Sequence, residues 1–252
     1  MELGIRGKRA AVAASSKGLG LGAALSLAAE GAHVVVSSRT QASVNEAVAQ
    51  IVAAGGSAIG IVADVSTGDG GAAFVTAAAE ALGGPIEILV TNAGGPPPGT
   101  FATTALDAYP AALELNLLSV VGMCKAAVPA MVTAGWGRVV AITSVSVRQP
   151  VAQLILSNTA RAGVTGFLKT LAREVAAHAI TVNSLQPGSH ATDRLYAVYG
   201  SDLSGVAAAV PAGVVGDPAD FGQVVAFLCS QQARFITGAH VPVDGGAYAG
   251  LL

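Results

Sequence analysis

Short runs of β-branched residues alternate with longer, alanine-rich segments along the chain. This alternation is typical of βαβ units, in which each short run is a strand of a parallel sheet that is buried on both faces. The expected strands are Ala10–Ala14, His33–Ser37, Ala58–Ala63, Ile86–Thr91, Arg138–Ser144, Thr181–Leu185 and His240–Val243. Seven such runs predict a doubly wound α/β fold.

The segments between these runs have good helix propensity. The expected helices are Leu19–Glu30, Gln41–Ala54, Gly71–Leu82, Asp107–Ala134, Asn158–His178 and Pro218–Ser230. No linker, repeat or low-complexity boundary divides the chain, so we expect one domain over residues 1–252. Residues 188–216 form the one long irregular segment, and we expect this segment to be a lid over a site at the strand ends.

Composition narrows the classes of function. Hydrophobic residues make up 52% of the chain and charged residues 11%, which favours a large core and self-association. A net charge of -2 without runs of like charge argues against nucleic acid or an anionic membrane as partner. We expect no membrane span and no signal peptide, and therefore a cytoplasmic protein. Cys124 and Cys229 lack metal or redox spacing and are expected in the core, so no metal site is predicted.

A glycine pair follows the first expected strand. In AASSKGLGLG, Gly18 and Gly20 open a helix, whose free N–H groups and dipole can bind an anion such as a dinucleotide pyrophosphate. A tight β-to-α turn without a ligand would also need these glycines. The position between a strand and an amphipathic helix favours the nucleotide site.

The residues after the second expected strand bear on the choice of cofactor. An acid there would bind the ribose hydroxyls of NAD and repel the 2′-phosphate of NADP. This strand instead ends with Ser38 and Arg39, and Lys17 lies in the glycine turn. Both cations can reach one 2′-phosphate, which favours NADPH. The alternative is that they are ordinary solvated surface charges.

From Gly7 to Gly246 the chain resembles the short-chain dehydrogenase/reductase family. The residues from Ala13 to Gly20 resemble its TGxxxGxG turn, Thr91–Gly95 its NAG motif and Pro187–Thr192 its PGxxxT segment. The end of the chain, FITGAHVPVDGGAYAGLL, resembles its last strand and the VDGG turn. The resemblance implies a Rossmann fold, a nicotinamide cofactor and a dimer or tetramer. Ala14 replaces the first glycine of the turn, so we expect a negative φ at this residue.

The resemblance also implies roles for single residues. Asp64 and Val65 would contact the adenine, Ala93 and Gly94 would let the ribose approach, and Thr192 would bind the carboxamide. The full expected cofactor set is Ala14, Ser16, Lys17, Gly18, Leu19, Gly20, Ser38, Arg39, Asp64, Val65, Asn92, Ala93, Gly94, Arg161, Pro187, Gly188 and Thr192.

The implied catalytic group contains a substitution. Asn116 would hold a water of a proton relay, and Ser144 would donate a hydrogen bond to the substrate oxygen. The family's YxxxK pair would fall at positions 157 and 161, where this chain has Ser157 and Arg161. A Ser hydroxyl is far less acidic than a phenol, and an arginine cannot exchange protons at neutral pH. Arg161 can still bind ribose hydroxyls or a substrate carboxylate.

Three residues of the expected lid are alternative acids. His190 has a side chain whose pKa suits general acid catalysis, but a lid histidine that points to solvent is an equal alternative. Tyr196 and Tyr199 could close over a substrate or simply pack. None of these residues restores a YxxxK pair.

These features predict an NADPH-dependent oxidoreductase that acts on the carbonyl or hydroxyl group of a small-molecule substrate. The GGPPPGTF, GWGR and SNxxR features resemble a divergent subgroup of 3-oxoacyl-acyl-carrier-protein reductase-like proteins, in which SxxxR replaces YxxxK. Two alternatives remain open, because a fold does not fix a function. One is a non-redox isomerase, dehydratase or cyclase, and the other is a catalytically silent NADP-binding subunit.

Overall fold

The computed structural model describes residues 2–251 and has one parallel sheet at its centre. The sheet order is β3-β2-β1-β4-β5-β6-β7. The strands are β1 (Arg9–Val12), β2 (His33–Ser38), β3 (Ser57–Val62), β4 (Ile88–Thr91), β5 (Gly137–Ile142), β6 (Ile180–Pro187) and β7 (His240–Val243). The order reverses between β1 and β4, which is the point where doubly wound sheets bind nucleotides.

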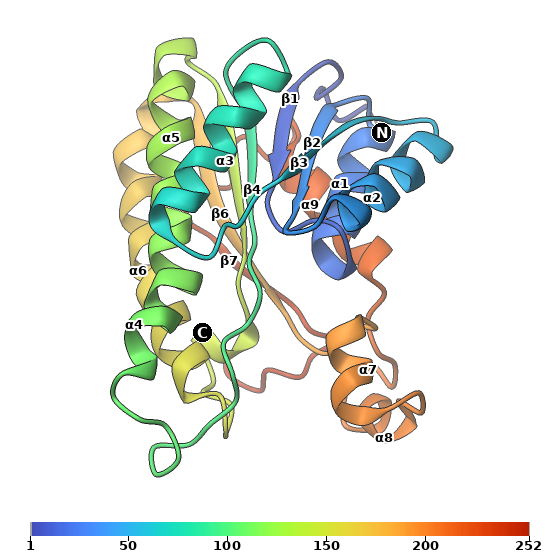
Figure 1. Ribbon diagram of the computed structural model, residues 1–252, viewed down its shortest axis with the longest axis vertical. Coiled ribbons are helices and arrows are strands. Elements are labelled where there is room, and N and C mark those ends of the chain that lie inside the picture. Colours follow the sequence, from blue (N-terminus) through green and yellow to red (C-terminus); the bar gives the residue numbers. More distant parts are fainter. Residues whose placement is uncertain (1, 252) are drawn as a thin grey trace.

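Helices cover both faces of this sheet (Figure 1). The helices α1 (Gly18–Ala29), α2 (Gln41–Ala53) and α9 (Pro218–Cys229) pack on one face, and α3 (Gly68–Ala81), α5 (Ser119–Ala134) and α6 (Ile155–Val175) pack on the other. The remaining helices are α4 (Ala108–Leu113), α7 (Asp193–Tyr199) and α8 (Ser204–Ala208). Two separate apolar clusters, one on each face, form the core.

The seven predicted strands all exist, and each begins and ends within two residues of its expected bounds. The seven-stranded doubly wound α/β fold is therefore confirmed. Strands that are buried on both faces are continuous apolar runs, which makes them easy to recognise in a sequence. Cys124 and Cys229 are both buried, in opposite apolar clusters, as expected.

Two expected elements differ in the structure. The helix expected from Asp107 to Ala134 is interrupted by η1, a π-helical turn over Glu114–Leu118. The segment 188–216, expected to be irregular, contains the short helices α7 and α8. Its glycines and proline hid these helices, because each helix lies between the residues that break it.

The continuous helical run Ala108–Ala134 is long and apolar enough to cross a membrane by length and composition, with a mean hydropathy of 1.7. No other helix of the described residues passes this test. Glu114 and Lys125 interrupt the run, and length and composition alone do not distinguish a membrane span from a core helix. In the structure, Met123, Cys124, Ala127 and Met131 of this run belong to the apolar cluster between α5, α3 and the sheet. Core helices of parallel sheets have this composition because they are buried on a wide face.

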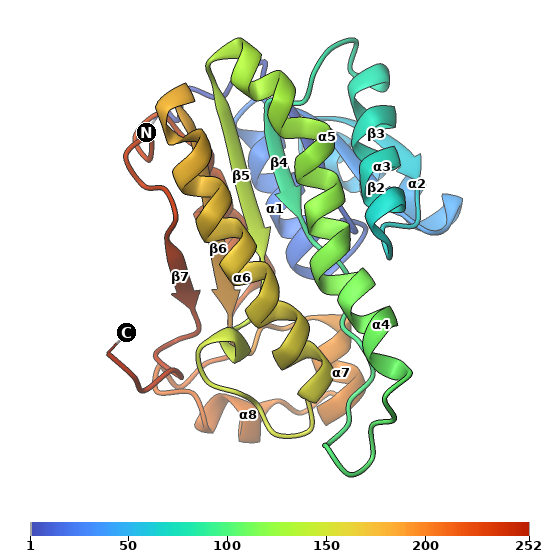
Figure 2. The ribbon, with the colours of Figure 1, turned by 90° about the vertical axis from the view of Figure 1, so that its left-hand side faces the viewer.

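Several irregular segments lie at the carboxyl ends of the strands (Figure 2). The segment 188–216 with α7 and α8 lies at this end, and so does the loop between β4 and α4. The backbone N–H of Gly99 in this loop donates to the carbonyl of Gln153, 2.7 Å away, and joins the loop to the chain before α6. The candidate site lies at this end of the sheet.

Candidate active site

A cleft of about 430 Å³ opens at the carboxyl ends of strands β1 to β4. Nine of the expected cofactor residues line it: Ala14, Ser16, Ser38, Arg39, Asp64, Val65, Asn92, Ala93 and Gly94. Gly95 and Leu115 also line this cleft. The cleft therefore brings together residues from four separate strand ends, as the topological reversal requires.

The glycine turn lies beside this cleft, and its two glycines are needed for different reasons. Gly18 has a φ of +55°, in the region that favours glycine. At Gly20, an added Cβ would lie 2.7 Å from the carbonyl oxygen of Ala14. Leu19 is partly buried and packs on the core cluster that includes residues of α1 and α9. The first N–H groups of α1 are thus left at an open turn, where an anion can bind.

Ala14 differs from its expectation, because its φ is +45° and not negative. Two hydrogen bonds hold its backbone between neighbouring strand ends. Its N–H donates to Ser37 Oγ at 3.0 Å, and its carbonyl accepts from Asn92 Nδ2 at 3.0 Å. A left-handed conformation costs a residue with a Cβ roughly 1–2 kcal/mol. The turn keeps its shape at this energetic cost.

The two cations expected at the 2′-phosphate lie in different places. Arg39 lines the cleft, next to Ser38, whose hydroxyl accepts a 3.1 Å hydrogen bond from Ser16. Lys17 does not line the cleft, and its ammonium lies 3.1 Å from Asp193 Oδ2 at the start of α7. The pair with Asp193 raises the pKa of Lys17. The structure therefore joins Lys17 to the 188–216 segment.

Asn116 lies in the π-helical turn that interrupts the expected long helix. Such turns often occur at functional sites, because they re-aim one side chain. The side chain of Asn116 is buried, and its Nδ2 donates to the Gly94 carbonyl at 2.8 Å. Its Oδ1 is buried without a protein partner. An acceptor in this state fits a bound water of the kind that the expected relay needs.

Ser144 follows β5 at the same edge of the sheet. Its Oγ accepts the backbone N–H of Ser146 at 3.1 Å, so its own hydrogen is available to another acceptor. Ser157 and Arg161 lie one turn apart on α6. Ser157 is buried, and Arg161 Nη1 donates to the carbonyl of Ile142 at 3.2 Å. This contact brings the guanidinium to the end of β5, two residues before Ser144.

The second half of the expected cofactor set surrounds the start of the 188–216 segment. Pro187 ends β6, and the N–H of Gly188 donates to the carbonyl of Val243. The methyl group of Thr192 lies against Gly18, so Thr192 contacts the glycine turn. Backbone hydrogen bonds from Ala191 to Gly216 and from Gly216 to Ser189 join the two ends of the segment. The segment is thus a closed loop beside the glycine turn.

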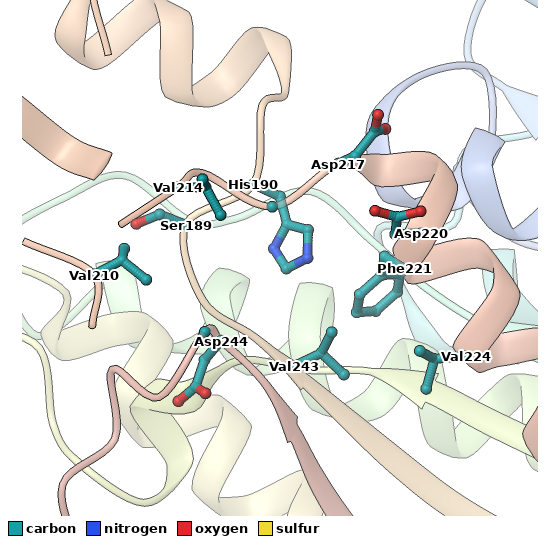
Figure 3. A pocket seen from close by; sticks show the side chains of 12 residues that line it. Ser189, His190, Val210, Val214, Asp217, Asp220, Phe221, Val224, Val243 and Asp244 are labelled. Carbon is teal, nitrogen blue, oxygen red and sulfur yellow. The ribbon is translucent and has the colours of Figure 1, made fainter. Parts of the chain in front are cut away.

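His190 does not lie in the cleft. It lines a separate pocket of about 160 Å³ that shares no lining residue with the cleft (Figure 3). Its ring is buried edge-on against Phe221, and its Nδ1 lies 3.2 Å from the Gly188 carbonyl. Burial lowers the pKa of His190. The expected alternatives, an acid at the substrate or a histidine that points to solvent, are both replaced by a packing role.

Tyr196 and Tyr199 lie on α7 and are exposed. Neither residue lines the cleft or the His190 pocket. Arg194, which lies between Asp193 and Leu195 in the same helix, was not expected at the site. Its guanidinium occupies the space beside Gly95, where an added Cβ would overlap Nη1. The one sequence signal for Arg194 is its position, two residues after the end of the PGxxxT segment.

The described residues fit a dinucleotide. Gly94 has no atom within 4 Å of the place where a Cβ would stand, so its surface is open to the cleft. Arg39 and the glycine turn provide positive charge and free N–H groups along the same cleft. Within residues 2–251, no group of three or more His, Cys, Asp or Glu side chains could hold a metal ion.

Comparisons with known proteins agree with this geometry. A family model described as enoyl-(acyl carrier protein) reductase matches residues 13–248. The chain is 36% identical over 247 residues to the 3-oxoacyl-[acyl-carrier-protein] reductase FabG of Pseudomonas aeruginosa, covering 98% of this chain and 99% of that protein. It is also 36% identical to the human dehydrogenase/reductase SDR family member 4, covering 95% and 87%.

Solved structures give the same result. L-sorbose reductase from Gluconobacter frateurii, solved with NADPH and L-sorbose, has a TM-score of 0.92 and 31% identity, with all of both chains covered. YwfH, an NADPH-dependent reductase involved in bacilysin biosynthesis, has a TM-score of 0.91 and 26% identity, covering 97% of this chain and 100% of that one. With its sheet order, its cleft and these relatives, the chain belongs to the short-chain dehydrogenase/reductase family of oxidoreductases.

Proposed function

We propose that this protein reduces a carbonyl group of a small molecule with NADPH. The observation that carries the choice of cofactor is the position of Arg39 beside Ser38 in the cleft, after β2. A guanidinium there can bind a 2′-phosphate through charge-assisted hydrogen bonds, and no carboxylate at the end of β2 repels it. L-sorbose reductase, a relative of the same fold, was solved with NADPH.

The side chains at the strand ends fit the chemical step. When bound, the reduced nicotinamide would supply the hydride. Ser144 would donate a hydrogen bond from its hydroxyl group to the substrate oxygen, because its Oγ already accepts a hydrogen bond from the Ser146 N–H. Asn116, fixed to the Gly94 carbonyl, would hold with its unpaired Oδ1 the water that passes on a proton. Ser157 and Arg161 would stand in place of the family's Tyr and Lys, with Arg161 as a fixed positive charge.

The experiment that tests this proposal separates binding from turnover. NADPH and NADH are titrated by fluorescence, and NADPH oxidation is then followed over a panel of ketones and aldehydes. We expect tighter binding of NADPH than of NADH, and NADPH consumption in step with alcohol formation. NADPH binding without oxidation by any carbonyl would contradict a reductase.

The replacement of an acidic phenol by Ser157 favours a second candidate, a non-redox enzyme on the same scaffold. Ser157 is buried, and its hydroxyl is a poor proton donor. An isomerase, dehydratase or cyclase of this kind would form product without any change in NADPH absorbance. A catalytically silent subunit would instead show stabilisation by NADPH and activity only after a second chain is added.

We also propose that the chain acts as a homodimer or homotetramer. Phe101, Phe235 and Leu251 are almost fully exposed, and such large apolar groups are costly in water. Members of a symmetric assembly would bury these side chains. Sedimentation or light scattering at micromolar concentration tests this, and a monomer at all concentrations would contradict it.

A further inference from the structure

Arg161 is a cation in an unusual position at the end of β5. It is partly buried, and among the described residues only one of its five N–H groups donates a hydrogen bond, the 3.2 Å bond from Nη1 to the Ile142 carbonyl. Burial, together with the nearby Arg194, lowers the pKa of Arg161 to about 10. The guanidinium therefore stays charged at neutral pH, with donors to spare.

Arg194 lies near the end of β4, the strand next to β5. It starts from α7, in the 188–216 segment, and its guanidinium lies against Gly95. Gly95 lines the cleft after β4, and Asn116 binds the carbonyl of the preceding Gly94. The two guanidinium groups thus lie at the ends of neighbouring strands, Arg161 at the end of β5 and Arg194 beside the loop after β4. The charge of Arg194 adds to burial in lowering the pKa of Arg161.

No carboxylate of the described chain neutralises this pair. The ion pairs among residues 2–251 join Lys8 and Arg9 to Glu87, and Lys17 to Asp193. Neither Arg161 nor Arg194 takes part in one. Two like charges at neighbouring strand ends repel, and the repulsion is stronger where one is partly desolvated. An anion between them would remove this repulsion and accept hydrogen bonds from both.

We propose that Arg161 and Arg194 together bind an anionic group, and that this group is the carboxylate of an oxo-acid substrate. The inference rests on the proposed reductase function and names its substrate class. The carbonyl of such a substrate would lie against Ser144, and its carboxylate would lie between the two arginines. Arginine suits this role because its planar donors bind a carboxylate with two parallel hydrogen bonds.

The cofactor diphosphate is a second anion that could reach these arginines. Substitution of Arg194 distinguishes a substrate carboxylate from the cofactor diphosphate, because each predicts a different loss of binding affinity. If the anion belongs to the substrate, loss of Arg194 leaves NADPH affinity unchanged and weakens only acids. If the anion is the diphosphate, the same variant weakens NADPH and affects acids and neutral ketones alike.

The test uses Arg194→Gln, with Arg173→Gln, an exposed arginine of α6, as the matched control. Pyruvate, acetoacetate and levulinate are each compared with their methyl esters. Calorimetry with NADP-saturated protein measures binding of each compound, and steady-state kinetics measures KM. We expect Arg194→Gln to weaken binding of the acids by about tenfold to a hundredfold, the loss of a charge-assisted pair, and to leave the esters and the Kd of NADPH unchanged.

Arg161→Gln and Arg161→Lys extend the test to the partly buried partner. We expect Arg161→Gln to lose affinity for the acids as Arg194→Gln does, and Arg161→Lys to recover part of it, because a charge returns without the planar fork. Equal losses for acids and esters, or a loss of NADPH affinity alone, would overturn the proposal. Because the calorimetry needs no turnover, acid binding without NADPH oxidation would contradict the reductase and not the anion site.

Discussion

The ammonium of Lys17 lies 3.1 Å from Asp193 Oδ2, and this ion pair joins the glycine turn to the start of α7. Both side chains are mostly exposed, so the pair itself contributes little to stability. It nevertheless holds the lysine at the 188–216 segment, whereas Arg39 lines the cleft. This arrangement changes which cation we expect to select the cofactor.

Arg39→Ala should lower the affinity for NADPH by about tenfold or more, because it removes the cation that lines the cleft. Lys17→Ala should lower it by less than about threefold, because its ammonium is held by an exposed carboxylate. Fluorescence titration with NADPH and NADH measures both values. Asp193→Asn is the control, and equal losses in the two cation variants would contradict this assignment.

Ala14→Gly should stabilise the protein, because glycine adopts a φ of +45° without strain. Relief of that strain exceeds the lost methyl contacts, and we expect a gain of roughly 0.5–1 kcal/mol in the free energy of unfolding. Urea denaturation measures the change. Ala13→Gly is the matched control, because Ala13 is buried without a positive φ and should lose stability. A loss at both positions would show that Ala14 is not strained.

Gly22→Ala should destabilise the protein by about 1–3 kcal/mol or more, because an added Cβ would overlap the Pro218 carbonyl where α1 crosses α9. Backbone atoms cannot move aside as a flexible side chain can. Gly166→Ala, in α6, is the control, since no atom lies within 4 Å of its Cβ position. Gly166→Ala should raise the free energy of unfolding by roughly 0.5–1 kcal/mol, because alanine has a higher helix propensity than glycine. Thermal and urea unfolding measure both variants, and similar effects would contradict the close crossing.

The free energy of unfolding should fall as the pH drops below about 6.5, the usual value for histidine. Burial lowers the pKa of both His190 and His240 in the folded protein, so the unfolded chain takes up protons first. The stability that neutral histidine provides is thus present above the unfolded pKa and is lost at lower pH. His190→Gln and His240→Gln should each make the midpoint of urea unfolding depend less on pH between pH 5 and 7. If both variants kept the pH dependence of the unmodified protein, the histidines would not be buried in their neutral form.

The fold could be predicted because its signal is local. The burial of an element can be recognised from the order of its own residues. β2 is a continuous apolar run that is buried on both faces, and α3 has apolar residues at helical spacing. Gly18 and Gly20 could be recognised in the same way, because a β-to-α turn with a positive φ and a close approach needs glycine. The π-helical turn at Asn116 could not, because it depends on how the long helix packs.

By itself, the sequence determined the seven strands, the parallel sheet and the candidate residues at the strand ends. The tertiary structure alone decided that Ala14 has a positive φ, that His190 is buried against Phe221, and that Arg194 comes to Gly95. The reason is physical. Periodicity records whether a residue is buried, whereas the partner of a charge and the strain of a turn depend on atoms that are brought together from distant parts of the chain.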